Sequence, residues 1–265
     1  MPARRRPIRS LLPALLMGPL LGVLPATLHA ACDTNRPWAP VVELYTSQGC
    51  SSCPPADAWL GSLDAAAQKR QVVPLAFHVD YWDHLGWRDP FAQAAHSERQ
   101  RRLSRAEGGS VVYTPQVRVA GEDFRQWRSP DAVRSALARR IPASAGAVAL
   151  SAEIGGDTLH AGASGELAHG SVGYLAVYER HLDSQIAAGE NAGRHLAHDY
   201  VVRRWIGPLQ PDAAGRVTVR QDIALEPGWK AAGLGIALVQ ADAASGAARL
   251  AASTPACVPG AAPGR

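Results

Sequence analysis

The chain has 265 residues, and its 27 Lys and Arg against 23 Asp and Glu give a formal net charge of +4. Arg4, Arg5, Arg6 and Arg9 all lie in the first ten residues, so the remainder has a net charge of 4 − 4 = 0. This balance argues against a nucleic-acid partner. The length suits one large or two modest domains.

The first 31 residues have the pattern of a secretory signal peptide. The arginines precede an apolar stretch that is interrupted by Pro13 and Pro19 and ends in small residues at Ala30 and Ala31. Such a stretch is too short for a membrane span. We therefore predict that residues 1–31 are a signal peptide, that the protein is periplasmic or secreted, and that the mature chain does not span a membrane.

Four cysteines follow this segment. Cys50 and Cys53 form a local pair, whereas Cys32 and Cys257 lie near opposite ends of the mature chain. Chain termini often lie close together, and disulfides persist in exported proteins. We predict a structural Cys32–Cys257 disulfide, whose long loop corresponds to a stabilisation on the order of 5 kcal/mol. The alternative is two free thiols on the chain ends.

Strand and helix patterns alternate between residues 38 and 143. The expected strands are residues 41–46, 72–79 and 111–120, and the expected helices are residues 55–69, 90–106 and a segment from 130 to just before Pro142. Asp89-Pro90 and Ser129-Pro130 have the residue types that begin helices. This alternation predicts an α/β layered domain.

The Cys50-Ser51-Ser52-Cys53 motif follows the first expected strand and precedes a helix. A thiolate is the attacking species in disulfide exchange, and a helix N-terminus stabilises negative charge. We predict that Cys50, expected to be the more exposed, attacks a partner and that Cys53 resolves the mixed disulfide. Such a motif in this setting is typical of a thioredoxin-like redox site.

A second set of residues is expected beside the cysteines. Pro115 lies at the entrance to a strand, where proline is tolerated as a first residue or in a cis peptide bond. We predict that Pro115 shapes the catalytic site, and that Thr114, His78, Asp80 and Trp82 line a substrate groove at the strand ends. The alternative for the groove residues is ordinary packing and turn capping.

Two other interpretations of the cysteine pair remain open. One is an inert structural disulfide. The other is a copper(I) site made of Cys50, Cys53 and His78, in an exported binding protein or metallochaperone. A thiol–disulfide oxidoreductase is the favoured hypothesis, with no metal and no cofactor, and its partners would be protein thiols and disulfides or a small-molecule thiol.

Residues 144–258 have a different composition, rich in Gly, Ala and alternating β-branched residues. The expected strands are residues 148–154, 158–163, 173–180, 200–206, 217–224 and 234–242, with a hairpin turn at Gly155-Gly156-Asp157. This pattern predicts an antiparallel sheet or sandwich. His195 and His198 are candidate metal ligands, but a surface or hairpin role is favoured because no third ligand is evident.

Several runs resemble a family of secreted bacterial proteins known as a domain of unknown function with a thioredoxin-like fold. They are Val41–Asp57, Phe77–Asp83, Gly86-Trp87, Tyr113–Gln116 and Glu190–Arg203. The resemblance implies a thioredoxin-like domain at 38–143, followed by a β-rich domain at 144–258. Resemblance to thioredoxin-like enzymes also implies that the backbone near Thr114 pairs with a substrate chain and that Pro115 keeps metals off the thiols. The family itself supplies no substrate.

Overall fold

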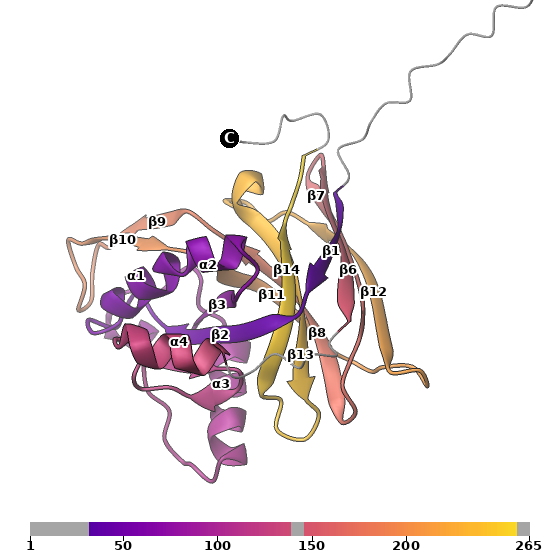
Figure 1. Ribbon diagram of the computed structural model, residues 1–265. Helices are drawn as coiled ribbons and strands as arrows, with labels where there is room; N and C mark the ends of the chain where they lie inside the picture. The colour runs from indigo at the N-terminus through magenta and orange to yellow at the C-terminus, as the bar shows by residue number, and fades with distance from the viewer. Residues whose placement is uncertain (1–31, 139–145, 259–265) are drawn as a thin grey trace, which may run out of the picture.

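The computed structural model describes residues 32–138 and 146–258, and its architecture is mostly β, with 44% strand and 19% helix (Figure 1). The expected signal peptide and the expected domain boundary after residue 143 lie outside the described residues.

Two central strands organise the sheet from which the site is built. Strands β2 (Ala39–Thr46) and β3 (Val73–His78) are buried along their whole length and pair in parallel. Strands buried on both faces are typically continuous apolar runs, as here in Val41–Val42 and Val72–Val73. Both strands end at the same edge of the sheet, because Thr46 pairs with His78. This edge places His78 beside the turn that leads to the cysteine pair.

The main sheet has eight strands in the order β14-β13-β8-β11-β3-β2-β4-β5. An additional pairing of β14 with β2 closes six of them into a barrel. The other strands of this sheet are β4 (Gln116–Val119), β5 (Glu122–Asp123), β8 (Ser171–Glu179), β11 (Val201–Leu209), β13 (Leu234–Asp242) and β14 (Ala248–Pro255). The sheet therefore joins strands from both halves of the chain.

A second sheet lies against the barrel on the side away from the helices (Figure 1). It contains β1 (Asp33–Pro37), β6 (Ala147–Gly155), β7 (Thr158–Glu166) and β12 (Arg216–Ala224) in the order β1-β6-β7-β12. Its alternating buried and exposed residues pack one face on a core that includes Leu150, Leu175 and Leu238. This core is separate from the one beneath the helices.

The helices gather on the opposite side of the main sheet (Figure 1). They are α1 (Pro54–Ser62), α2 (Asp64–Gln68), α3 (Ala94–Ala106) and α4 (Pro130–Ala138), with short 3-10 turns at Asp83–Leu85 and Ala231–Gly233. Leu60 and Leu103 bury their side chains against Leu75 and Phe77 of β3. A two-stranded hairpin, β9 (Leu182–Gln185) and β10 (His195–His198), lies beside α1.

The predicted fold class, an α/β thioredoxin-like domain followed by a separate β-rich unit, is wrong. Strand β3 pairs with β11 (Ala76 with Val201), and β2 pairs with β14 (Pro40 with Leu250), so the N-terminal strands belong to a barrel completed by C-terminal strands. The strand–helix alternation of residues 38–143 is a local pattern. Such a local pattern does not specify which distant strands pair with the N-terminal strands. Here the pairings of β3 with β11 and of β2 with β14 determine the architecture.

Candidate functional site

The cysteine pair closes a small disulfide ring at the start of α1. Cys50 and Cys53 are bonded, with a Cα–Cα distance of 5.4 Å. Cys53 is the N-cap of α1, and Pro54 and Pro55 are its first two residues. Proline at the first helical positions is favoured because those positions need no N–H for the helix. The backbone N–H groups of Ala56 and Asp57 donate to the Cys53 carbonyl at 2.8 and 3.1 Å.

Both cysteines are fully buried, so Cys50 is not the more exposed of the two, contrary to the expectation from the sequence. The residues between them, Ser51 and Ser52, are exposed. The Ser52 hydroxyl lies 3.4 Å from Cys50 Sγ, within hydrogen-bond distance for sulfur. The ring therefore lies directly beneath the surface, with Cys50 beneath an exposed serine.

The loop between β9 and β10 covers this ring. The side-chain amide of Asn191, itself buried, donates to the carbonyl oxygens of Gln48 and Cys50 at 2.8 and 3.0 Å. Glu190 accepts from the Ser51 N–H at 3.0 Å. These contacts connect the loop at 186–194 to the cysteine motif, more than 130 residues away in the chain.

Thr114 and Pro115 lie at the same edge of the sheet as the cysteine turn, because Tyr45 of β2 pairs with Gln116 of β4. The Thr114–Pro115 peptide bond is cis. The indole N–H of Trp82 donates to the Thr114 hydroxyl at 2.8 Å. Trp82 also packs against Gly49, where an added Cβ would lie 3.0 Å from the Trp82 Cβ. Trp82 thus connects Thr114 to the buried Gly49, and Trp82, Thr114 and Pro115 all keep some exposure.

His78 does not lie on an open groove wall, because it is completely buried and its Nδ1 lies 2.7 Å from Asp89 Oδ2. Asp80 accepts from the hydroxyl of Ser97 and is half-buried, so part of its surface remains exposed.

Gln48 contacts several of the polar residues that lie under the disulfide. Its backbone N–H donates to Asp89 Oδ2 at 2.8 Å, and its side-chain nitrogen donates to the Ser184 hydroxyl at 2.8 Å. Its side-chain oxygen accepts from the Trp87 indole at 2.9 Å. The Gln48 side-chain nitrogen also lies 3.2 Å from His198 Nε2. The cysteine turn is therefore fixed to both β3 and the β9–β10 hairpin.

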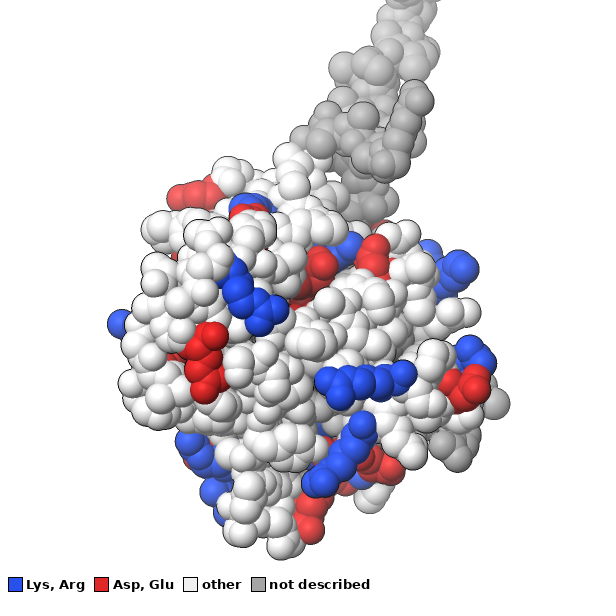
Figure 2. All heavy atoms as spheres, turned by 90° about the vertical axis from the view of Figure 1, so that its left-hand side faces the viewer, with Lys and Arg blue, Asp and Glu red and all other residues white. Residues whose placement is uncertain are grey.

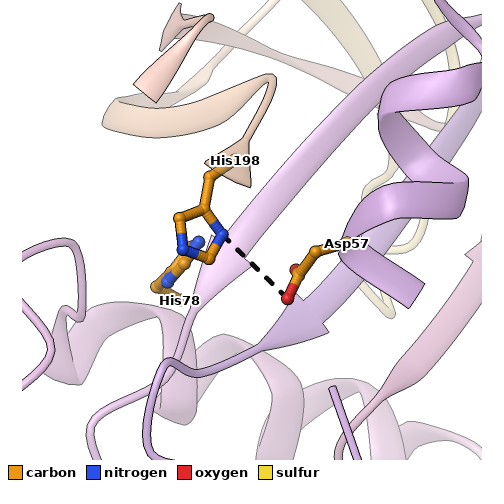
Figure 3. Close-up of side chains that lie close together, drawn as sticks. All are labelled: Asp57, His78 and His198. Carbon is orange, nitrogen blue, oxygen red and sulfur yellow. Dashed lines mark ion pairs between the residues drawn. The ribbon is translucent and has the colours of Figure 1, made fainter. Parts of the chain in front are cut away.

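Three further side chains meet in the interior. Asp57 from α1, His78 from β3 and His198 from β10 point toward one another, and one ligand atom from each lies within 4.8 Å of the others (Figure 3). His198 Nδ1 lies 4.0 Å from Asp57 Oδ2. Buried polar atoms are nearly always hydrogen-bonded, but His78 Nε2 and His198 Nδ1 have no hydrogen-bond partner in the described structure.

The pKa values of these groups reflect burial and mutual charge. Burial raises the pKa of Asp57 to about 7, although the charge of His78 opposes this rise. Burial and the charge of His78 lower the pKa of His198 to about 3. Burial also disfavours a charged His78, but the ion pair with Asp89 outweighs it and raises the pKa of His78. The interior therefore holds one ion pair beside His198, which burial keeps neutral, and Asp57, whose protonated form burial favours.

Cys32 and Cys257 form a second disulfide at the other end of the molecule. Their Cα atoms are 5.8 Å apart, and the bond joins residues separated by 225 positions. Cys257 also forms an isolated bridge with Glu153 of β6. Two disulfides are consistent with an oxidising environment.

Sequence reasoning missed Asp57, Asp89, Gln48 and Asn191, and it favoured a surface or hairpin role for His198. The available signals were the runs Val41–Asp57 and Glu190–Arg203, which contain four of these five residues. Nothing local to either run indicates that the two meet in space. His195, the other histidine considered there, is exposed on β10 and pairs with Asp183.

The surface around the helices carries charges of both signs. Figure 2 shows basic and acidic side chains interspersed over the face that lies at the left of Figure 1. Among the described residues, no helix combines the length and apolar character needed to cross a membrane.

The comparisons with known proteins identify a family and two similar folds. The sequence model of the family "Protein of unknown function (DUF1223)" matches residues 41–240, which confirms the expected resemblance to a domain of unknown function. The crystal structure of protein AGR_C_4864 from Agrobacterium tumefaciens is 26% identical, with a TM-score of 0.56, and the match covers 81% of this chain and 92% of that one. HBP35 of Porphyromonas gingivalis has a similar fold at 16% identity, with a TM-score of 0.63 over 87% of this chain and 79% of that one. No curated protein matches.

Proposed function

We propose that this chain, which belongs to the DUF1223 family of proteins of unknown function, exchanges its Cys50–Cys53 disulfide with thiols of partner molecules. The observation that carries this proposal is the small size of the ring, which joins residues only three positions apart. In the chain-entropy model such a loop contributes about 2 kcal/mol to stability, whereas a loop as long as that of Cys32–Cys257 contributes about 5 kcal/mol. A bond that stabilises the chain so little fits exchange better than structural support.

The exchange takes place in two steps, and the electrons that the partner loses pass to the cysteine pair. A partner thiolate attacks Cys50 Sγ, a bond forms between the partner sulfur and Cys50, and Cys53 leaves with the electron pair and takes up a proton. A second partner thiolate then attacks the partner's sulfur in this mixed disulfide and releases Cys50 as a thiolate. The partner is oxidised by two electrons and the pair is reduced. In the reverse direction Cys50 attacks a partner disulfide and Cys53 resolves the intermediate.

The neighbours of Cys50 support its role as the sulfur that meets the partner. The Ser52 hydroxyl, 3.4 Å from Cys50 Sγ, is in position to donate to a thiolate there. Ser52 is also exposed, whereas Cys53 is followed directly by Pro54 and Pro55 at the start of α1. Because both cysteines are buried, the loop at 186–194 must move away before a partner can reach Cys50.

The partners and the compartment follow from the same chemistry. Protein thiols and disulfides or a small-molecule thiol are the natural reactants for such a pair. The protein would work in an exported compartment, periplasmic or extracellular, where a pool of disulfides persists. The mixed charges of the face in Figure 2 fit such partners better than a polyanion.

A trapping experiment with glutathione tests this function. Cys53→Ala leaves Cys50 without its resolving partner, so treatment of the folded variant with oxidised glutathione should give a stable mixed disulfide at Cys50, detected by peptide mass. The double variant Cys32→Ser/Cys257→Ser is the matched control, and its Cys50–Cys53 pair should exchange as in the wild type. The proposal fails if Cys50 in folded Cys53→Ala takes up no glutathione and the wild-type pair also resists dithiothreitol under native conditions.

A further inference from the structure

The interior cluster below the cysteine turn has the composition of a metal site. It consists of a carboxylate and two imidazoles from three separate elements, α1, β3 and β10 (Figure 3). Two imidazoles and a carboxylate are a donor set that suits borderline divalent metals such as Zn²⁺. None of the three residues belongs to the disulfide ring, so the cluster is separate from the proposed exchange.

Burial with unsatisfied nitrogen atoms is the second observation that points to a ligand. His78 and His198 are 0% and 2% exposed, and Asp57 is 7% exposed. His78 Nε2 and His198 Nδ1 nevertheless have no hydrogen-bond partner among the described residues. Folded proteins seldom leave a buried polar atom unpaired, so two such atoms beside one carboxylate indicate a shared ligand.

We propose that Asp57, His78 and His198 bind one divalent transition-metal ion, with Zn²⁺ the best match, through a carboxylate oxygen, Nε2 of His78 and Nδ1 of His198. Bond lengths of about 2.0–2.2 Å place ligand atoms roughly 3.4 Å apart. The three side chains therefore move inward by roughly 1 Å from their spacing of up to 4.8 Å. Three protein ligands leave a fourth position for water or a small ligand.

The residues around the cluster orient the ligands in the way that metal sites require. His78 Nδ1 lies 2.7 Å from Asp89, which fixes the ring with Nε2 toward the cluster. Metal-binding histidines commonly use one nitrogen for the metal and donate the other N–H to a carboxylate. Metal binding at Nε2 displaces the proton of the His78 imidazolium, Asp57 gives up its proton as it binds, and both protons pass to solvent. The carboxylates of Asp57 and Asp89 then supply the two negative charges that balance a buried divalent cation.

His198 requires one rearrangement of its neighbour. Gln48 directs its side-chain NH₂ toward His198 Nε2, which makes that nitrogen the acceptor and leaves the proton on Nδ1. Metal binding at Nδ1 moves this proton to Nε2, and a turn of the Gln48 amide then presents its oxygen to Nε2–H. This turn breaks the bond from Trp87, a partly buried residue, and it reverses the bond with Ser184, whose hydroxyl then donates to the amide oxygen.

The test is a titration of the full protein with Zn²⁺ after removal of bound metal by a chelator. The wild type should bind one equivalent, and Asp57→Asn and His198→Ala should each weaken binding at least about 100-fold. His195→Ala is the matched control on the same strand and should bind as the wild type does. Asp89→Asn should weaken binding by about 10–100-fold, because Asp89 acts as a positioning residue.

A cobalt spectrum separates this site from a thiolate site. Co²⁺ bound by the wild type should show no sulfur-to-cobalt charge-transfer band, and Cys50→Ser/Cys53→Ser should bind Zn²⁺ as the wild type does. Stoichiometric binding should also raise the melting temperature of the wild type but not of Asp57→Asn. The proposal is overturned if the wild type binds no zinc, or if folded Asp57→Asn and His198→Ala retain its affinity.

Discussion

The side-chain amide of Asn191 donates to the carbonyl oxygen of Cys50 at 3.0 Å, across 141 positions of the chain. The same amide bonds the Gln48 carbonyl, so one buried side chain makes two of the hydrogen bonds that hold the β9–β10 loop over the disulfide, beside the bond from Ser51 to Glu190. Access to the proposed reactive sulfur therefore depends on how often these hydrogen bonds open together.

Asn191→Ala should make the disulfide easier to reach. Each of the two lost hydrogen bonds is worth about 1 kcal/mol, so the open form of the loop should become roughly 30-fold more populated. The rate at which dithiothreitol reduces Cys50–Cys53 in the folded protein should rise by the same factor. His195→Ala, in the same hairpin but without contacts to the cysteine turn, should leave this rate unchanged. An unchanged rate in Asn191→Ala would show that the loop does not limit access.

Proline at the start of α1 should limit the reactivity of the reduced pair. Pro54 and Pro55 have no N–H to offer a thiolate, and the next two N–H groups are already bonded to the Cys53 carbonyl. Pro54→Ala/Pro55→Ala adds two backbone donors at the helix N-terminus, where a negative charge gains about 0.3–1 kcal/mol. Cys50 should then react about two- to fivefold faster with iodoacetamide at neutral pH. Pro130→Ala, the same change at the start of α4, should have no such effect.

The two disulfides should have separable roles. Cys32→Ser/Cys257→Ser opens a loop of 225 positions and should lower the free energy of unfolding by up to about 5 kcal/mol. Urea unfolding of the double variant measures this loss. The exchange rate of Cys50–Cys53 in the still-folded variant should stay at the wild-type value. A large change in that rate would mean that the distant disulfide controls the site.

Asp64 should make part of the stability pH-dependent. It accepts from the Tyr200 hydroxyl at 2.6 Å and pairs with Arg180 at 2.7 Å. Burial acts to raise the pKa of Asp64, but these two partners outweigh it and lower the pKa. The folded state thus keeps Asp64 ionised to a lower pH than the unfolded chain does. The stabilisation that ionised Asp64 provides is fully present at pH values above its unfolded-state pKa of about 4. It is lost as the pH falls through the pKa of Asp64 in the folded state.

Asp64→Asn tests this dependence. The variant should be about 1–2 kcal/mol less stable than the wild type at pH 7, because it loses hydrogen bonds to a charged acceptor. The difference should shrink when urea unfolding is repeated near pH 3. Asp131→Asn, which removes an exposed carboxylate from α4, should change stability by no more than about 0.5 kcal/mol. A difference that stays the same at both pH values would contradict the account.

Much of the secondary structure could be read from local patterns, because strand period and turn residues are properties of neighbouring residues. The buried runs at 41–46 and 72–79 contain most of β2 and all of β3, and the hairpin signal at Gly155-Gly156-Asp157 lies where β6 turns into β7. The cysteine motif does lie at a strand-to-helix turn. These features depend on side chains that are close in the chain.

The barrel and the interior cluster depend on contacts between distant residues, and the sequence did not predict them. No local pattern specifies that Val201 pairs beside Ala76, and without that pairing His198 cannot be placed near His78. Asp57, the carboxylate beside His198 in the proposed metal site, is 141 positions away and appears in the sequence as an ordinary first-turn helix residue. Likewise, the burial of Cys50 results from Asn191, in a loop with no evident link to the motif.

Equilibration of the folded protein in glutathione buffers tests the central claim most directly. After acid quenching and alkylation, peptide mass analysis gives the oxidised fraction of each cysteine pair. The account predicts that Cys50–Cys53 changes from oxidised to reduced as the glutathione ratio is varied, while Cys32–Cys257 remains oxidised in the same samples. A Cys50–Cys53 pair that stays oxidised at every ratio until the protein unfolds would contradict the account.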